Sequence, residues 1–195
     1  MKVITIAREF GAGGRTIGRE VANRLGIQYY DRDLIMKTAE ESKFLTAEDI
    51  RKFDEKLPVE VGFAQSLFNF YAKPLSEQIF DAQSKAIRKI AETESCVMVG
   101  RNAEYILKEF DHVLKVFVCA NKEWKITHMK EQMPELSRDE IEAQMNSIDK
   151  ARKNYTKKFS NQVYGQANNY DMCLNISSIG IDKAVEYIID AYANI

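Results

Sequence analysis

Residues 2–18, which read KVITIAREFGAGGRTIG, contain the pattern that decides the fold of this chain. Residues 2–7 are mainly β-branched and apolar, which predicts a buried strand, and glycines follow at positions 11, 13 and 14. Apolar residues then recur at helical spacing from Ile17 to Leu25. A glycine-rich turn between a strand and a helix brings backbone N–H groups and the helix N-terminus close to an anion. We therefore expect this loop to hold the phosphates of a nucleotide.

The rest of the chain alternates between expected strands and helices, which predicts an α/β fold. Residues 32–93 contain no convincing strand and predict a helical insertion, and two helices are expected between residues 120 and 155. The alternation predicts a five-stranded parallel sheet with helices on both faces. A length of 195 residues suits one domain, residues 1–195. We expect the five strands at residues 2–7, 27–30, 95–100, 112–120 and 170–177.

The composition is that of an ordinary globular protein, with 45% hydrophobic and 29% charged residues and a formal net charge of -1. This balance gives no global field that would attract nucleic acid or an acidic membrane surface. No signal peptide and no membrane-length apolar run is apparent, so we expect a cytoplasmic protein without nucleic-acid or membrane partners. Cys96, Cys119 and Cys173 lie in expected strands without metal-ligand spacing, which predicts buried free thiols.

The dinucleotide-binding pattern G-x-G-x-x-G fits the glycine loop in part. Gly11 and Gly13 match its first two glycines, and Asp31, at the end of the second strand, would then contact a ribose. Thr16 stands at the third glycine position, where a Cβ would crowd the packing of helix on strand. An NAD-dependent oxidoreductase is therefore one alternative.

The P-loop pattern G-x-x-x-x-G-K-[ST] also fits in part. Gly14, Arg15 and Thr16 match its last three positions if Arg15 replaces the lysine, and Glu9 then stands at the first glycine. The planar fork of an arginine binds phosphate but is not equivalent to the point charge of a lysine. A glycine turn that packs tightly without any ligand is a third alternative. The strand–loop–helix context favours phosphate binding.

Segments along the whole chain resemble those of the cytidylate kinase-like proteins, a branch of the P-loop nucleoside monophosphate kinases. The segment AREFGAGGRTIGREVANRLGIQYYDRDLI (7–35) resembles their opening, including a tyrosine–aspartate step after the second strand. The resemblance continues, in order, through VMVGRNAEYIL (97–107), VLKVFVCANKEWKI (113–126), DKARKNYTKKF (149–159) and NNYDMCLNIS (168–177). It implies a three-layer α/β/α P-loop NTPase fold with a helical insertion and a lid.

The resemblance also implies an activity: transfer of the ATP γ-phosphate, with Mg²⁺, to a nucleoside monophosphate or a related small acceptor. The insertion at 32–93 would bind the acceptor, and Thr16 would place a hydroxyl near Mg²⁺. Arg15 and Arg152 would be catalytic. The donor phosphates would lie on Gly11, Ala12, Gly13, Gly14, Arg15 and Thr16, and the acceptor on Asp31, Arg101, Asp149 and Arg152.

The chain departs from the family pattern at several phosphate contacts. Glycine or arginine, depending on the alignment, stands where the cytidylate kinases carry the P-loop lysine. Asn102 replaces the aspartate of their G-R-D step, and Met145 stands where an arginine is expected. Lys125 and His128 lie on a helix that usually carries arginines. These departures keep open a second function, a nucleotide-binding or regulatory protein without catalysis.

A basic stretch in residues 150–158 lies within a region, about residues 134–169, that the kinase hypothesis makes a helical lid. A solvated helix face is the alternative explanation of such a stretch. Residues 155–169 are polar and are expected to be mobile or partly helical. Aromatic residues of the insertion fit core packing, a homodimer contact or a base-binding pocket; they are Phe63, Phe68, Phe70 and Tyr71.

Overall fold

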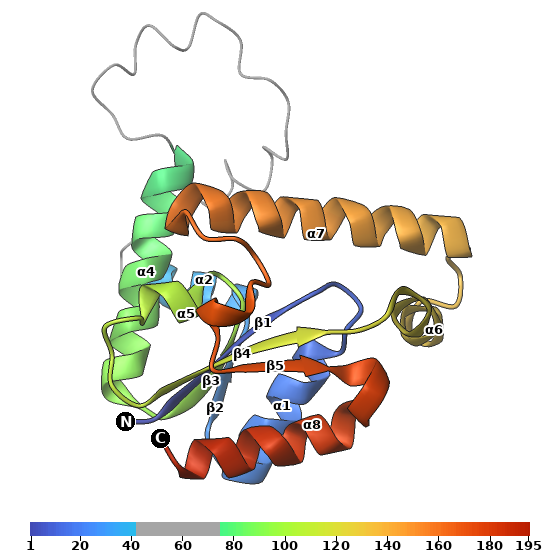
Figure 1. The fold of residues 1–195 in the computed structure, drawn as a ribbon. Coiled ribbons are helices and arrows are strands. Elements are labelled where there is room, and N and C mark those ends of the chain that lie inside the picture. The colour runs from blue at the N-terminus through green and yellow to red at the C-terminus, as the bar shows by residue number, and fades with distance from the viewer. Residues whose placement is uncertain (42–74) are drawn as a thin grey trace, which may run out of the picture.

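The computed structural model describes residues 1–41 and 75–195. One parallel sheet forms its centre, with the strand order β2-β3-β1-β4-β5 (Figure 1). This confirms the expected α/β fold with five parallel strands. The strands are β1 (Val3–Arg8), β2 (Gln28–Tyr30), β3 (Cys96–Val99), β4 (Val113–Cys119) and β5 (Met172–Asn175).

The central position of β1 decides between the two nucleotide-binding folds considered above. Val3 of β1 is in register with Cys96 of β3 on one side and with Val113 of β4 on the other. Dinucleotide-binding folds place the second strand next to the first. Here β3 separates β1 from β2, so the strand order does not support the NAD-dependent alternative.

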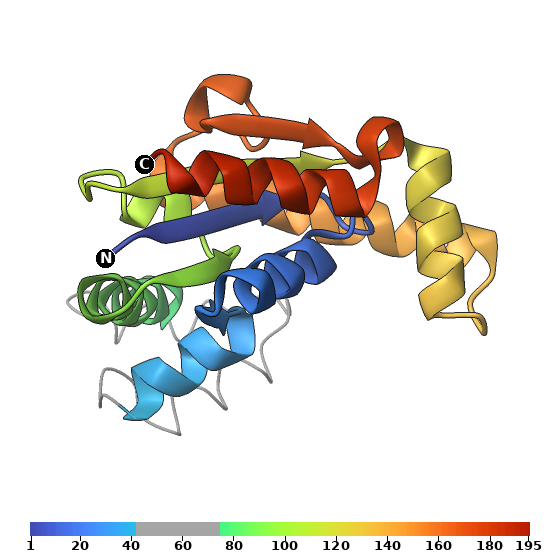
Figure 2. The ribbon, with the colours of Figure 1, turned by 90° about the horizontal axis from the view of Figure 1, so that it is seen from below.

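Helices cover both faces of the sheet and make the expected three layers. Helices α1 (Gly14–Leu25) and α8 (Ile176–Ala193) lie together across one face, as Figure 2 shows. The shorter helices α2 (Arg32–Glu41) and α5 (Ala103–Ile106) lie with α4 (Leu75–Thr93) on the opposite side. Helix α6 (Lys122–Gln132) follows β4, and α7 (Arg138–Ser160) runs along the side opposite α1 and α8 (Figure 1).

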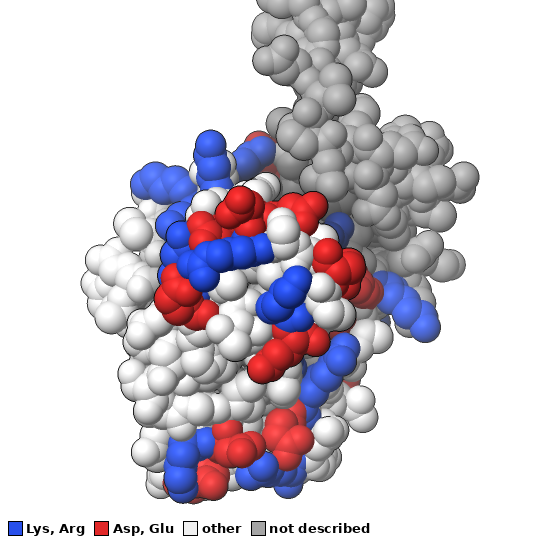
Figure 3. All heavy atoms as spheres, turned by 90° about the vertical axis from the view of Figure 1, so that its right-hand side faces the viewer, with Lys and Arg blue, Asp and Glu red and all other residues white. Residues whose placement is uncertain are grey.

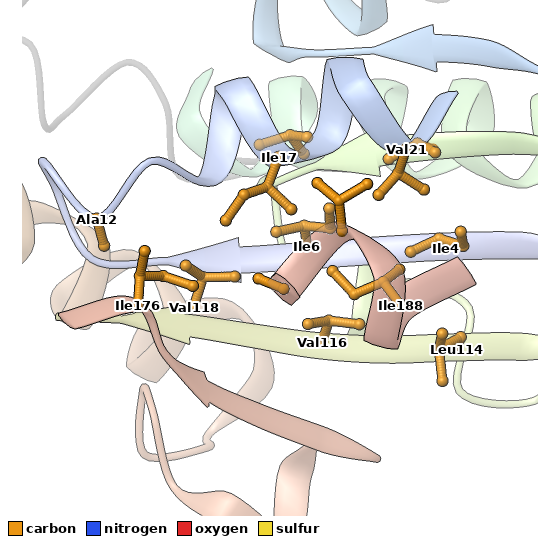
Figure 4. Packing of buried hydrophobic residues seen from close by; sticks show 14 of the residues in the cluster. Ile4, Ile6, Ala12, Ile17, Val21, Leu114, Val116, Val118, Ile176 and Ile188 are labelled. Carbon is orange, nitrogen blue, oxygen red and sulfur yellow. The ribbon is translucent and has the colours of Figure 1, made fainter. Parts of the chain in front are cut away.

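The alternation of side chains along the strands divides the core between these layers. Ile4 and Ile6 of β1 point toward α1 and α8, where they pack with Ile17, Val21 and other buried side chains (Figure 4). Val3 belongs to the second cluster, which packs against α2, α4 and α5. Both faces of the central strand β1 are therefore buried from solvent, as expected for a parallel sheet.

The later segments confirm one expectation and overturn another. Helix α7 continues through Ser160 and a 3-10 helix follows at Ala167–Asn169, so the polar residues 155–169 are partly helical, one of the two states expected for them. All three cysteines are free, but Cys119 is only partly buried and Cys173 is exposed. The prediction of burial was wrong for Cys173 because β5 is an edge strand whose residues alternate between partly buried and exposed.

The insertion expected at residues 32–93 is helical wherever the structure describes it, in α2 and α4. Phe63, Phe68, Phe70 and Tyr71 lie outside the described residues. In the ranges 1–41 and 75–195, no helix combines the length and the apolar character that crossing a membrane requires.

Gly18 lets α1 approach the sheet closely. A Cβ at this position would lie 2.8 Å from Cγ2 of Val99 and 3.2 Å from Cε2 of Tyr29. We predict that Gly18→Ala lowers the free energy of unfolding by about 1–2 kcal/mol, because overpacking outweighs the helix propensity gained. Urea unfolding measures this change.

Asn23→Ala, on the exposed face of the same helix, is the matched control and is expected to be neutral or slightly stabilising. A Gly18→Ala variant more stable than the parent would contradict the close approach.

Candidate functional site

The loop between β1 and α1 has the backbone of an anion site. Gly11 and Gly13 have φ of 78° and 79°, a region that glycine enters without a steric penalty. Gly13 is the N-cap of α1, and no side chain caps its N–H groups. The first turn contains no acidic residue. The N–H groups of Gly14, Arg15 and Thr16, in the first turn of α1, therefore have no acceptor within the helix. They are free to donate to a ligand at its N-terminus.

Ala12 has a different part in the loop from its neighbours. Its side chain is fully buried with the core residues near Ile176 (Figure 4), and its N–H donates to the carbonyl of Glu9 at 3.4 Å. Ala12 thus anchors the loop to the core, whereas Gly11, Gly13, Gly14, Arg15 and Thr16 line the adjoining cleft.

That cleft has a volume of about 690 Å³, a size typical of small-molecule sites. Its described lining comes from the loop and the start of α1, from the turn after β3 and the following α5, from α6 and α7, and from Arg32 of α2 and Tyr164. The carboxyl ends of the strands meet here, which is where open α/β sheets bind their ligands. The structure thus brings the loop, Arg101 and Arg152 together in one cleft.

Asp149 and Arg152 of α7 hold the backbone of the loop. The Phe10 N–H donates to Oδ1 of Asp149 at 2.8 Å, and Nη1 of Arg152 donates to the Arg8 carbonyl at 2.9 Å. The two side chains also form an ion pair, with 3.2 Å between Nη1 and Oδ1. The Tyr164 hydroxyl donates to the same Arg8 carbonyl. This group of contacts, the α7 clamp, fixes the loop before any ligand arrives.

Three left-handed residues form the turn after β3. Gly100, Arg101 and Asn102 have φ of 86°, 61° and 53°, a conformation that costs free energy for residues other than glycine. The guanidinium of Arg101 lies over the ring of Tyr155, 5.6 Å from its centroid. Burial lowers the pKa of Arg101. Strained backbone of this kind occurs mainly where a side chain must be aimed at a site.

Asn102 is buried against α7 at this turn. Its Oδ1 accepts a hydrogen bond of 2.9 Å from the Thr156 hydroxyl, and its Nδ2 makes no hydrogen bond to a described residue. The amide replaces the aspartate expected from the family pattern, so the positive charge of Arg101 is not balanced within the turn. Asn102 is one of the residues that line the cleft, and its unpartnered nitrogen is buried.

Arg8 also extends into the cleft, and sequence reasoning missed it. Burial is the main cause that lowers its pKa, to about 10, and the nearby charges of Arg152 and Arg15 contribute. In the part of the chain that the structure describes, no carboxylate forms an ion pair with this guanidinium. The signal in the sequence is an arginine at the last position of the first strand, directly before the loop.

Glu104 is a second residue that sequence reasoning missed. It lines the cleft from α5 and is almost fully buried, which raises the pKa of its carboxyl to about 7, while the charge of Arg8 acts in the opposite direction. A single glutamate in a short apolar helix gave no pattern from which to infer this placement.

Two other charged residues have structural partners. Nζ of Lys125 forms an ion pair with Oε2 of Glu9 at 2.8 Å, which links α6 to the loop. Asp31 caps α2, since its Oδ1 accepts from the N–H groups of Asp33 and Leu34 at 3.1 and 3.3 Å. Asp31 is not among the described residues that line the cleft, so its contact with a ligand remains a prediction.

Ion pairs also join α6 to the start of α7. Arg138 pairs with Glu123 at 2.5 Å and Lys122 with Glu142 at 2.6 Å, and Figure 3 shows acidic and basic side chains interspersed on this face. Each exposed pair contributes little to stability. Together with the buried contact of Ile126 and Met129 with Ile141, they join α6 to α7 beside the loop.

The cytidylate kinase-like family model matches residues 3–178. The chain belongs to this family. The resemblance drawn from the loop and the downstream segments is therefore confirmed over nearly the whole chain. No curated protein sequence matches this chain.

Solved structures of the same fold include P-loop kinases. An uncharacterized protein from Eubacterium ventriosum ATCC 27560 superposes with a TM-score of 0.78 at 25% identity, covering 100% of both chains. A gluconokinase from Sinorhizobium meliloti 1021 gives 0.57 at 11% identity, covering 99% of this chain and 92% of its own. Shikimate kinase from Bacteroides thetaiotaomicron gives 0.52 at 15% identity, with 97% of each chain covered. The chain thus has a P-loop kinase fold.

The raised pKa of Glu104 predicts a pH-dependent stability. Between pH 4.5 and about 7 the folded protein keeps a proton on this carboxyl that the unfolded chain releases, so this group makes stability fall as the pH rises. Glu104→Gln removes that dependence. The quantity to compare is the free energy of unfolding of the variant minus that of the parent. We predict that this difference is about 3 kcal/mol larger at pH 8 than at pH 4.5.

Urea unfolding at both pH values measures the difference. Glu109→Gln, at a largely exposed carboxylate nearby, is the control and is expected to show no such change. An equal effect of Glu104→Gln at the two pH values would show that Glu104 titrates normally.

Proposed function

We propose that this protein is an ATP-dependent kinase that transfers the γ-phosphoryl group to a nucleoside monophosphate or a related small phosphorylated acceptor. The observation that supports it most strongly is the cleft itself. It joins the open N-terminus of α1 to the guanidinium groups of Arg8, Arg15, Arg101 and Arg152. Phosphoryl transfer requires positioning and charge neutralisation more than covalent chemistry by the protein, and this lining provides both.

The loop is assigned to the donor. Backbone N–H groups from Gly13 to Thr16 would bind the ATP phosphates, and Arg15 at the exposed rim would add charge. Among the described residues, no three His, Cys, Asp or Glu side chains cluster as a metal site. A Mg²⁺ ion would therefore rest mainly on phosphate oxygens and the Thr16 hydroxyl, which lies at the cleft, and it would neutralise the charge of the transferring phosphoryl group.

The turn after β3 is assigned to the acceptor. Arg101 would bind the acceptor phosphate, and its strained backbone fixes where its guanidinium points. Asp149 and Arg152 hold the loop in this structure, so we assign them first to positioning. Nη1 of Arg152 is engaged with the Arg8 carbonyl and Asp149, and its remaining N–H groups would face the transferring phosphoryl group. The helices α2 and α4 would carry the acceptor-binding insertion, and α7 the lid.

A nucleotide-binding protein without catalysis is the second candidate. It is favoured by the replacement of the P-loop lysine and by the engagement of the Asp149–Arg152 pair with the loop. It predicts nucleotide binding without ADP formation in the presence of any acceptor.

A screen of acceptors tests the proposal. ADP release from ATP and Mg²⁺ is measured with a panel of nucleoside monophosphates and small phosphorylated or carboxylated hydroxyl compounds. We expect turnover with one class of acceptor, and we expect Arg101→Ala, purified in the same way, to raise the KM for it by about tenfold to a hundredfold.

The Arg101→Ala variant also excludes a contaminating kinase, whose activity the substitution would not change. Nucleotide binding without turnover for the whole panel, at high protein concentration, would favour the second candidate.

A further inference from the structure

The positive φ of Gly13 decides how the loop aligns with the P-loop pattern. The last glycine of G-x-x-x-x-G-K-[ST] directly precedes the lysine. Gly13, with φ 79°, is the N-cap of α1, whereas Gly14 is already the first helical residue. With Gly13 in the last glycine position, Gly14 occupies the lysine position and Arg8 occupies the position of the first glycine. Arg15 then stands at the Ser/Thr position, and Thr16, the hydroxyl assigned to Mg²⁺, follows one residue later. A glycine and a cation have thus exchanged places.

The exchange is sterically coupled. A Cβ on Gly14 would lie 2.7 Å from both Cβ and Cγ of Arg8, which is closer than real Cβ contacts. The side chain of Arg8 therefore occupies the space that the stem of a lysine at position 14 would need. The side chain of Arg8, in this position, requires that residue 14 have no side chain.

A second glycine marks where the guanidinium lies. A Cβ on Gly100 would lie 2.1 Å from Nη1 of Arg8. The side chain thus extends from the end of β1, past the first residue of α1, to the turn after β3. It lines the cleft between the loop, assigned to the donor, and the turn after β3, assigned to the acceptor.

The guanidinium of Arg8 is available to bind an anion. Its carbonyl is fixed by Arg152 and by the Tyr164 hydroxyl, while no described carboxylate pairs with its guanidinium. Two other basic residues near the loop are less suitable replacements for the P-loop lysine. Lys125 is paired with Glu9, and Arg15 is exposed at the rim.

We propose that Arg8 is the phosphate-binding cation of the donor site and takes the place of the P-loop lysine, from the opposite end of the loop. The proposal rests on the proposed function and extends it by naming the residue that binds the terminal phosphates of a nucleoside di- or triphosphate. It transfers to Arg8 the part that the sequence analysis gave to Arg15. The planar fork of an arginine binds two phosphate oxygens at once, which a lysine does not.

Binding of ADP, measured by calorimetry, tests this without requiring turnover. Arg8→Ala is expected to raise the Kd by about tenfold to a hundredfold, the effect of losing one charged hydrogen-bonding partner. Arg15→Ala is expected to have a smaller effect. Arg24→Ala, an exposed arginine at the far end of α1, is the control and should leave the Kd unchanged. An unchanged Kd for Arg8→Ala, or no ADP binding by the parent protein, would overturn the proposal.

Returning the exchanged residues to the standard pattern provides the sharper test. Gly14→Lys alone should weaken both folding and binding, because its Cβ meets the side chain of Arg8. The double variant Arg8→Gly with Gly14→Lys removes that clash and restores a lysine at its usual place. We expect it to bind ADP at least about tenfold more tightly than Arg8→Gly.

Thermal unfolding of all variants separates loss of binding from loss of folding. A folded double variant that binds no better than Arg8→Gly would overturn the proposal. Failure of every acceptor in the screen, with ADP binding and its dependence on Arg8 intact, would instead reject only the proposed catalysis.

Discussion

The structure depends on cationic charge held in a cleft at the end of the central strand. Among the described residues, Arg8 has no carboxylate partner, whereas Arg152 is paired with Asp149. The guanidinium groups of Arg8 and Arg152 lie in one cleft, and Arg15 is close enough to contribute to the lowered pKa of Arg8. Like charges in a partly buried site repel one another, and partial burial also removes hydrating water. A fold that keeps these guanidinium groups together is stabilised when a polyanion binds, because the anion offsets their repulsion. The cleft is therefore complementary to a ligand with several negative charges, and a nucleotide polyphosphate has that property.

The rest of the fold holds those charges in position. Strand β1, which is buried from Val3 to Ala7, fixes where Arg8 leaves the sheet, and the α7 clamp fixes its carbonyl and the Phe10 N–H. Helix α7 is itself fixed at one end by α6 and at the other by the stacked rings of Phe159 and Phe80, 4.3 Å apart. A loop held from both sides before the ligand binds loses little entropy on binding, and its N–H groups need no reorganisation.

Much of this could be predicted from the sequence because the signals were local. The hydrophobic strands, the glycines before α1 and the alternation of elements predicted the parallel sheet, and the ordered family segments predicted a P-loop kinase fold. The strand order could not be read from periodicity, because β3 reaches its place beside β1 only after the long insertion. The exposure of Cys173 was missed because an edge strand and a central strand have similar apolar sequences. Glu104 and Arg8 were missed because their significance depends on what lies across the cleft from them.

A crystal structure of the protein with bound ADP tests the central claim most directly, since it locates the phosphates relative to the loop. The account predicts the diphosphate at the N-terminus of α1, within hydrogen-bond distance of the N–H groups of Gly14 to Thr16, with the Arg8 guanidinium on its terminal phosphate. A diphosphate bound elsewhere, or one bound by Arg15 while Arg8 points away from it, would contradict the account.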